Sequence, residues 1–279
     1  MKVIILTKKS MLKGLLIAAL AVAVLVAAFQ VVPRVAAAMA ANRQLPIYNV
    51  QRSDKTVSLT FDAAWGNEDT QQLIDILAKR KVHATFFVVG AWVDKYPESV
   101  KALSDAGNEV MNHSDTHPHM PKLSRDGMLK EIEACDAKIQ KVTGKKPILF
   151  RAPYGDYNNT LVETLKGSGH YCIQWNVDSL DWKGISAADI QKRVLSKVQP
   201  GSIILFHNAA IHTPEALPGI IESLQKQGYQ IVPVSQMIYQ GNYTIDAAGK
   251  QHPAAVSSAA GSSSAAGSSS AGGSPSAAS

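Results

Sequence analysis

Short apolar runs alternate with longer segments of helical periodicity through the middle of this chain, and this alternation limits the folds it can adopt. Such short runs are typical of buried strands, whereas the longer amphipathic segments are typical of helices. Strands that alternate with helices form parallel sheets, because each helix carries the chain back across the sheet. We therefore predict an α/β barrel of about seven strands, at residues 57–61, 84–89, 109–112, 148–151, 171–175, 202–207 and 230–234.

Helix start signals fall in the gaps between these runs. Asp69 and Thr70 are placed to cap a helix, and Ser124 precedes a longer amphipathic one. Pro97 and Pro214 stand where a first helical turn accepts proline, because the missing N–H has no partner at that position. Both features support strands joined by helical crossovers.

Polar side chains lie at or just after the ends of the predicted strands. In a parallel barrel the carboxyl ends of the strands meet on one face, where active sites are built. We therefore expect one site to collect residues from five segments: Asp62, His113, Arg151, the pair Asp178 and Asp181, and His207.

His113 and His117 stand four positions apart, the spacing at which two side chains of one helical turn can reach a single metal ion. Two imidazoles alone hold a divalent ion poorly, because catalytic zinc sites usually have three protein ligands. The pair therefore predicts a hydrolytic metal site that requires a third ligand.

Both ends of the chain differ in composition from the middle. Residues 1–41 carry lysines and then an almost uninterrupted apolar run from Gly14 to Val32, which indicates an export signal or an uncleaved membrane anchor. We favour the anchor, with the rest of the chain outside the cytoplasm. We expect a linker at 42–55, one domain at 56–240, and a disordered Ala/Ser/Gly-rich tail at 247–279.

The charge distribution argues against a nucleic-acid partner. The formal net charge is +6, but five of the basic residues lie in the predicted leader, Lys2, Lys8, Lys9, Lys13 and Arg34, and without them 23 basic residues face 22 acidic ones. Nucleic-acid binding needs a clustered excess of basic residues, which this charge balance does not provide.

The two cysteines, Cys135 and Cys172, are too few for a disulfide framework, and we expect two unpaired, buried thiols.

Five short motifs follow one another between about residues 56 and 240: Thr60-Phe61-Asp62, His113-Ser114-x-x-His117, Arg151-x-Pro153-Tyr154-Gly155, Asp178-Ser179-x-Asp181-Trp182 and Leu205-x-His207. In this order they resemble the motifs of the polysaccharide deacetylase family, the carbohydrate esterases with a NodB homology domain. The resemblance implies a distorted (β/α) barrel that removes acetyl groups from chitin, peptidoglycan or xylan with a zinc-type ion. Nickel or cobalt are alternatives to zinc.

The resemblance also implies roles for individual residues. His113 and His117 would be metal ligands, and Asp62 would be the base. The backbone N–H of Tyr154 would face the oxyanion, and His207 would be the general acid. Positioning and substrate contacts would come from Arg151 beside the base, Asp181 beside the acid, and Trp182 with Leu205 around the acetyl methyl group.

The first motif departs from the family pattern Thr-Phe-Asp-Asp-Gly, because Ala63 stands where the metal-binding carboxylate is expected. Three alternatives remain for the metal. Asp62 itself coordinates it; Asn67, Glu68 or Asp115 reaches in; or the site binds metal weakly or not at all. The Ala-Ala-Trp-Gly variant resembles a sporulation-associated sub-branch of peptidoglycan deacetylases.

Two functions follow from this motif. The first is an extracytoplasmic, metal-assisted deacetylase of peptidoglycan or a related acetylated polysaccharide. The second is a glycan-binding or sporulation protein that has the barrel but little catalysis.

Overall fold

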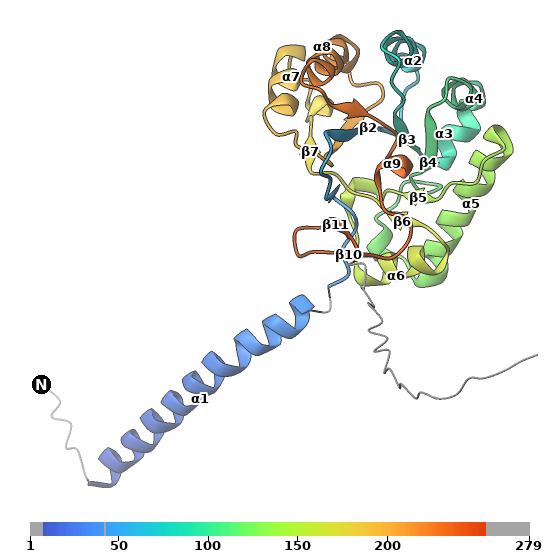
Figure 1. Cartoon of the computed structure of the whole chain (residues 1–279). Helices are drawn as coiled ribbons and strands as arrows, with labels where there is room; N and C mark the ends of the chain where they lie inside the picture. The colour runs from blue at the N-terminus through green and yellow to red at the C-terminus, as the bar shows by residue number, and fades with distance from the viewer. Residues whose placement is uncertain (1–7, 42, 255–279) are drawn as a thin grey trace, which may run out of the picture.

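The computed structural model describes residues 8–41 and 43–254, and it consists of one α/β domain preceded by a long helix (Figure 1). The helix, α1, runs from Lys8 to Ala41 and extends away from the domain, with apolar side chains such as Leu16 and Phe29 exposed. Within the described residues, none of the helices combines the length and the apolarity needed to cross a membrane. The predicted anchor or export signal stays a prediction.

A curled parallel sheet forms the centre of the domain and confirms the predicted fold class. The strands are β2 (Thr56–Ala63), β3 (Thr85–Val88), β4 (Glu109–Asn112), β5 (Leu149–Phe150), β6 (Tyr171–Cys172), β7 (Val177–Asp178), β8 (Ile203–His207) and β9 (Gln230–Ile231). Their order is β6-β5-β4-β3-β2-β8-β7, with β9 pairing separately with β2. All seven predicted strands are present, and the short β7 is an addition.

The register of the central strands decides which side chains become neighbours. Asp62 of β2 is the partner of His207 of β8, and Phe87 of β3 is its partner on the other side. Below this level Phe61 stacks between Phe86 and Phe206, with ring centroids 4.7 and 5.4 Å away. Because side chains alternate along a strand, burial of Phe61 on one face directs Asp62 to the other.

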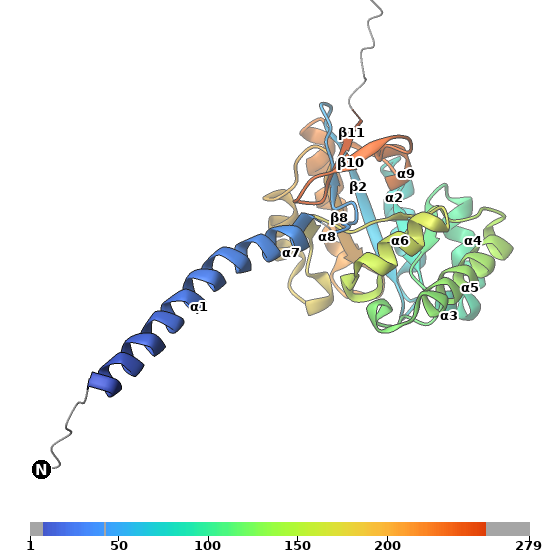
Figure 2. The same ribbon diagram turned by 90° about the horizontal axis from the view of Figure 1, so that it is seen from below.

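Helices cover the outside of the sheet: α2 (Thr70–Lys79), α3 (Gly90–Lys95), α4 (Pro97–Asp105), α5 (Arg125–Thr143), α6 (Asn159–Gly167), α7 (Ala187–Leu195) and α8 (Thr213–Lys226). The short α9 (Val234–Met237) packs on the other face, against Phe87 and Ile203. Figure 2 shows α3, α4 and α5 grouped on one side and α7 with α8 on another. Short 3₁₀ turns are η1 (Met120–Lys122), η2 (Pro153–Gly155) and η3 (Asp181–Lys183).

The helix start signals were correct in position but not always in mechanism. Ser124 caps α5, because its hydroxyl accepts a hydrogen bond from the backbone N–H of Gly127. Asp69 precedes α2 without capping it, and its carboxylate accepts the backbone N–H of Ala209 on the opposite loop instead. Tertiary contact therefore replaces the predicted cap.

A second, small sheet changes the predicted domain boundaries. Its strands are β1 (Asn49–Val50), β10 (Tyr243–Ile245) and β11 (Lys250–Pro253), in the order β1-β11-β10. The predicted linker at 42–55 and the predicted start of the tail at 247 are therefore wrong at these positions. The remaining tail, 255–279, lies outside the described residues. Composition gave no sign of β1 as a strand, because its partner β11 lies about two hundred residues further along the chain.

Close backbone packing holds β1 against the main sheet. A Cβ atom at Gly201 would lie 1.7 Å from the carbonyl oxygen of Val50, and Gly201 has a φ of +80°. Only glycine allows both this backbone conformation and this close approach.

Cys135 and Cys172 are free and buried, as predicted. Burial raises the pKa of both thiols, that of Cys172 to about 12.

Candidate active site

A pocket of about 760 Å³ opens at the carboxyl ends of the sheet strands. Most of the predicted site residues line it: Asp62, His113, His117, Tyr154, Asp178, Asp181, Trp182, Leu205 and His207. Arg151 lies behind this lining and is fully buried. The structure thus brings together side chains from five separate segments, as the strand-end pattern predicts.

Arg151, which follows β5, and Asp62 of β2 form a buried ion pair. Nη1 of Arg151 donates to Oδ1 of Asp62 at 2.7 Å and to the hydroxyl of Thr60 at 2.9 Å. Nη2 donates to the carbonyl oxygen of Gln174 at 3.2 Å, and the guanidinium carbon lies 4.2 Å from the ring centroid of Phe87. These contacts hold the cation in one orientation.

The ion pair sets the charge of Asp62. Burial alone would raise the pKa of this carboxyl group, but the positive charge of Arg151, with smaller effects of His113 and His207, lowers the pKa below its usual range. Burial also lowers the pKa of Arg151. Asp62 is therefore a carboxylate, and Oδ2, which does not receive the Arg151 bond, is the oxygen available to the pocket.

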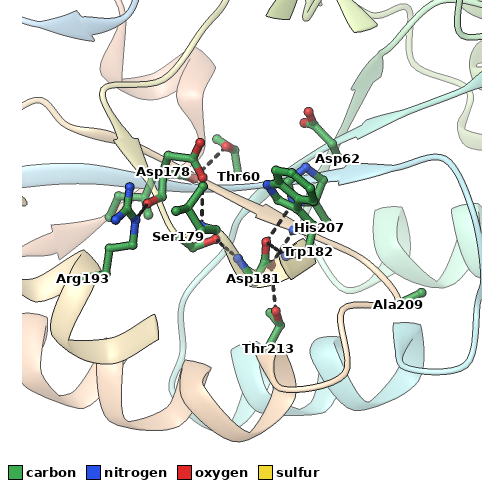
Figure 3. A network of polar contacts seen from close by, with 12 residues as sticks. Thr60, Asp62, Asp178, Ser179, Asp181, Trp182, Arg193, His207, Ala209 and Thr213 are labelled. Carbon is green, nitrogen blue, oxygen red and sulfur yellow. Dashed lines mark hydrogen bonds and ion pairs between the residues drawn. The ribbon is translucent and has the colours of Figure 1, made fainter. Parts of the chain in front are cut away.

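His207 is held on the neighbouring strand by Asp181. Oδ1 of Asp181 accepts from the ring Nδ1 of His207 at 2.8 Å, and Oδ2 accepts the backbone N–H of His207 at 2.8 Å. The hydroxyl of Thr213 also donates to Oδ2 at 2.7 Å, as Figure 3 shows. Burial opposes the charged imidazole, but Asp181 outweighs it and raises the pKa of His207.

His113 and His117 present two neutral imidazoles to the same pocket, with ring centroids 5.0 Å apart. Nδ1 of His113 donates to the carbonyl oxygen of Arg151 at 2.7 Å, so in the neutral ring Nε2 keeps its lone pair. Burial lowers the pKa of His113, and burial beside His113 lowers the pKa of His117 to about 4. Both rings are therefore uncharged at neutral pH.

The local structure of this motif differs from the prediction. Residues 113–117 form a loop after β4, not a helical turn, and both Ser114 (φ 67°) and His117 (φ 61°) have left-handed backbone conformations. The two rings still meet, because the loop folds back over the strand end. The spacing correctly indicated that the two rings lie close together, but it assigned the wrong secondary structure to the residues between them.

The described residues do not complete a three-ligand metal site. No group of three His, Cys, Asp or Glu side chains in residues 8–41 and 43–254 is placed to hold an ion. Oδ2 of Asp62 lies 3.6 Å from Nε2 of His113, while Ala63 is packed in the main apolar cluster. Nδ1 of His117 is buried with no hydrogen-bond partner among the described atoms. Among the described residues, the pocket therefore offers two imidazole rings as metal ligands and no third ligand.

The alternative ligands considered from the sequence are engaged elsewhere. Asp115 pairs with Lys138 at 2.6 Å, and the side-chain oxygen of Asn67 accepts from Thr70 and Ser99. Glu68 accepts the backbone N–H of Asn67. Of the three alternatives for the metal, the one in which Asn67, Glu68 or Asp115 reaches into the site is therefore wrong for this structure.

Tyr154, Trp182 and Leu205 surround the pocket in different ways. Leu205 is buried in the wall, whereas Tyr154 and Trp182 are more than half exposed at the mouth. Tyr154 has a left-handed backbone (φ 60°, ψ 6°) within η2, and its ring stacks on His119. Trp65, also exposed, lies edge-on to His117 at 4.8 Å.

Sequence reasoning missed several lining residues. Trp175 lines the pocket and lies 5.5 Å from the Arg151 guanidinium carbon, and residues 208–211 form the wall beyond His207. Trp175 stands at the end of a predicted strand, so the strand-end pattern contained a signal for it. Ile211 does not directly follow a strand and is 78% exposed, so the position of strand ends could not predict that it lines the pocket.

Comparisons with known proteins agree with this geometry. The model of the polysaccharide deacetylase family matches residues 49–173. The peptidoglycan-N-acetylmuramic acid deacetylase PdaC of Bacillus subtilis is 39% identical over 188 residues, 67% of this chain and 40% of PdaC. The corresponding deacetylase PdaA of Bacillus subtilis is 32% identical over 192 residues, which cover 67% of this chain and 73% of PdaA.

Solved structures show the same likeness. A CE4 family pseudoenzyme from Bacillus anthracis is 34% identical, with a TM-score of 0.67 over 74% of this chain and 72% of that chain. A mutant of that pseudoenzyme with restored enzymatic activity is 37% identical, with a TM-score of 0.66 over 69% of this chain and 70% of that chain. Together with the pocket geometry, these matches show that the chain belongs to the polysaccharide deacetylase family.

Proposed function

We propose that this domain removes acetyl groups from the N-acetylated amino sugars of peptidoglycan or a related polysaccharide. One observation carries the proposal. Asp62, a carboxylate held by Arg151, and His207, an imidazole whose pKa is raised, are register partners at the ends of adjacent strands in one pocket. Amide hydrolysis needs a base for the attacking water and an acid for the leaving amine.

The two groups can divide the reaction between them. A water bound to Oδ2 of Asp62 gives a proton to the carboxylate as its oxygen forms a bond to the acetyl carbonyl carbon. His207 then donates its proton to the amide nitrogen, the C–N bond breaks, and acetate and the free amine leave. Asp62 returns its proton to solvent, and His207, oriented by Asp181, takes one up again.

The remaining contacts fit an acetylated sugar. In this proposal the backbone N–H of Tyr154 donates to the developing oxyanion, and Trp182 and Leu205 enclose the acetyl methyl group. Exposed aromatic rings at the mouth suit the apolar faces of pyranose rings. The peptidoglycan deacetylases PdaC and PdaA support this substrate class, although this chain spans 40% of PdaC.

Metal dependence is a separate part of the proposal. Zinc, nickel or cobalt would be held by His113 and His117, but these two residues leave the ligand set incomplete. The described residues do not supply three protein ligands, so the reaction steps above use no metal ion. We propose that any metal binding by the natural chain is weak.

The test is acetate release by the full-length chain. Peptidoglycan and N-acetylglucosamine oligomers are incubated with the wild-type protein and with Asp62→Asn, with and without added Zn²⁺, Ni²⁺ or Co²⁺. Acetate from the wild type and an at least 100-fold lower rate from the variant are expected, since a positioned base contributes about 100- to 10,000-fold. Equal rates from both proteins, or none under every condition, would falsify the proposal.

A second candidate is a glycan-binding protein with little or no catalysis. The incomplete ligand set at Ala63 favours it, as does the similarity to the CE4 family pseudoenzyme. Calorimetric binding of glycan oligomers by the wild type, without acetate release and without metal binding, would support this function. Absence of glycan binding would exclude both candidates.

The location is proposed from the N-terminal sequence. We propose that residues 1–41 export the chain and anchor it, so that the domain lies outside the cytoplasm, where its polymer would be found. Protease added to intact cells would then cleave the domain. Protection of the domain until the cells are lysed would contradict this location.

A further inference from the structure

The loop that carries the two pocket histidines depends on contacts from helix α5. The loop between His113 and His117 contains two non-glycine residues with left-handed conformations, Ser114 and His117. Such conformations are uncommon for non-glycine residues and persist only where surrounding contacts over-determine them. The source of these contacts therefore decides where the His117 ring lies.

Glu131 of α5 makes the densest set of contacts with this loop. Its Oε2 accepts the backbone N–H of Asp115 at 2.9 Å and that of Thr116 at 2.8 Å, and its Oε1 accepts the hydroxyl of Thr116 at 2.7 Å. One carboxylate thus accepts the backbone N–H groups of the two residues that precede His117. Hydrogen bonds to an ionised acceptor are stronger than neutral ones.

Two further residues of α5 hold the same segment. Lys138 pairs with the carboxylate of Asp115 at 2.6 Å. Asp136 accepts from the side-chain amide of Asn112 at 2.7 Å, and the amide oxygen of Asn112 accepts the backbone N–H of Ser114 at 2.7 Å. Helix α5 therefore holds the loop at its beginning and middle, and Glu131 is its contact closest to His117 in sequence, while the backbone N–H of His117 itself donates to the hydroxyl of Ser114 at 3.0 Å.

The two histidine rings are held differently. His113 is fixed through its own ring, because Nδ1 donates to the Arg151 carbonyl oxygen. Nδ1 of His117 has no hydrogen-bond partner among the described residues, and its ring contacts Trp65, His113 and Tyr154 by packing. The position of the His117 ring is therefore set mainly by its backbone.

We infer that Glu131 is a positioning residue, which sets the His117 ring in the pocket through the backbone of Asp115 and Thr116 without touching substrate. The inference rests on the proposed function only for its kinetic consequence. The position of the His117 ring does not depend on activity, so this part of the inference can be tested even if the protein is inactive.

The experiment compares three variants of the full-length chain. Glu131→Ala removes all three acceptor contacts, whereas Glu131→Gln keeps one carbonyl oxygen for the loop. Glu133→Ala is the matched control, since Glu133 lies on the same helix and is exposed. Histidine-ring NMR signals are assigned with His113→Gln and His117→Gln, and the melting temperature of each variant is measured.

We expect the His117 signals to shift in Glu131→Ala, to shift less in Glu131→Gln and to stay in place in Glu133→Ala. The His113 signals should shift less than those of His117, because the His113 ring is held by Arg151 and senses only the ring current of the neighbouring imidazole. If the wild type is active, kcat should fall roughly 10- to 100-fold in Glu131→Ala with little change in KM. Unmoved His117 signals, or equal shifts of His113 and His117, would overturn the inference. A wild type without activity would overturn the proposed function but leave the NMR result decisive.

Discussion

Asp62 and His207 are register partners on the adjacent strands β2 and β8, so a carboxylate with a lowered pKa stands beside an imidazole with a raised one. Each is held from behind by an opposite charge, Asp62 by Arg151 and His207 by Asp181. Acid–base catalysis requires one group that is deprotonated and one that is protonated, and the surroundings of Asp62 and His207 favour these two states.

The first prediction concerns the pH dependence of catalysis. Asp181→Asn removes the charge that outweighs burial and raises the pKa of His207, so the pKa should fall. Because the reaction needs protonated His207, the decline of kcat with rising pH should begin at a lower pH in the variant. Asp189→Asn, an exposed change on α7, is the control and should leave the profile in place. Superimposable profiles for Asp181→Asn and the wild type would count against His207 as the acid.

The second prediction concerns the buried ion pair. Asp62→Asn leaves the fully buried guanidinium of Arg151 without its anion, and we expect the free energy of unfolding to fall by about 3 kcal/mol or more. The double change Asp62→Asn with Arg151→Met should recover part of this loss, because neither charge then remains buried. Urea unfolding of the wild type and three variants, Arg151→Met included, gives the coupling energy. Additive losses would contradict a coupled pair.

The third prediction follows from the sign of the Asp62 shift. Its pKa is lowered in the folded state, so its ionisation stabilises the fold above the carboxyl's unfolded pKa, and this contribution is lost as pH falls through the folded value. The stability difference between wild type and Asp62→Asn should be constant near neutral pH and should shrink below about pH 4. A difference independent of pH throughout the acid range would refute it.

The fourth prediction concerns the missing metal ligand. Ala63 is packed in the apolar cluster, so Ala63→Asp should lower the melting temperature in the absence of metal. Added Zn²⁺ should then raise it again, because an ion that binds only the folded state stabilises it. Ala64→Asp is the comparison, since Ala64 lines the pocket and a carboxylate there costs less. Equal effects of Zn²⁺ on the wild type and on Ala63→Asp would exclude a restored site.

The fifth prediction separates the backbone of Tyr154 from its side chain. Its φ of 60° favours glycine, so Tyr154→Gly should not lower the melting temperature through backbone strain. If the backbone N–H is the oxyanion donor, kcat should change by less than about 10-fold, whereas KM for glycan oligomers should rise because the exposed ring is lost. A large fall in kcat at unchanged KM would assign the catalytic role to the phenol side chain.

Much of the site could be predicted because strand ends are readable from local pattern. Asp62 and His207 each follow a buried apolar run, and the parallel topology places such ends on one face. The contribution of Glu131 could not be predicted in this way. Glu131 lies in the middle of an amphipathic helix, and only the packing of α5 against the loop lets its carboxylate accept hydrogen bonds from two backbone N–H groups.

Local periodicity was enough to predict the parallel α/β architecture, and the motifs at the strand ends were enough to identify the family. The resemblance to that family then implied the two charge pairs of the site. Three features became visible in the folded molecule alone: the histidines lie on a loop with left-handed residues, no third metal ligand approaches them among the described residues, and β1 and β11 belong to the domain. All three have one cause. Backbone hydrogen bonds and side-chain contacts between distant segments leave no periodic trace in the chain, whereas burial on a strand or a helix does.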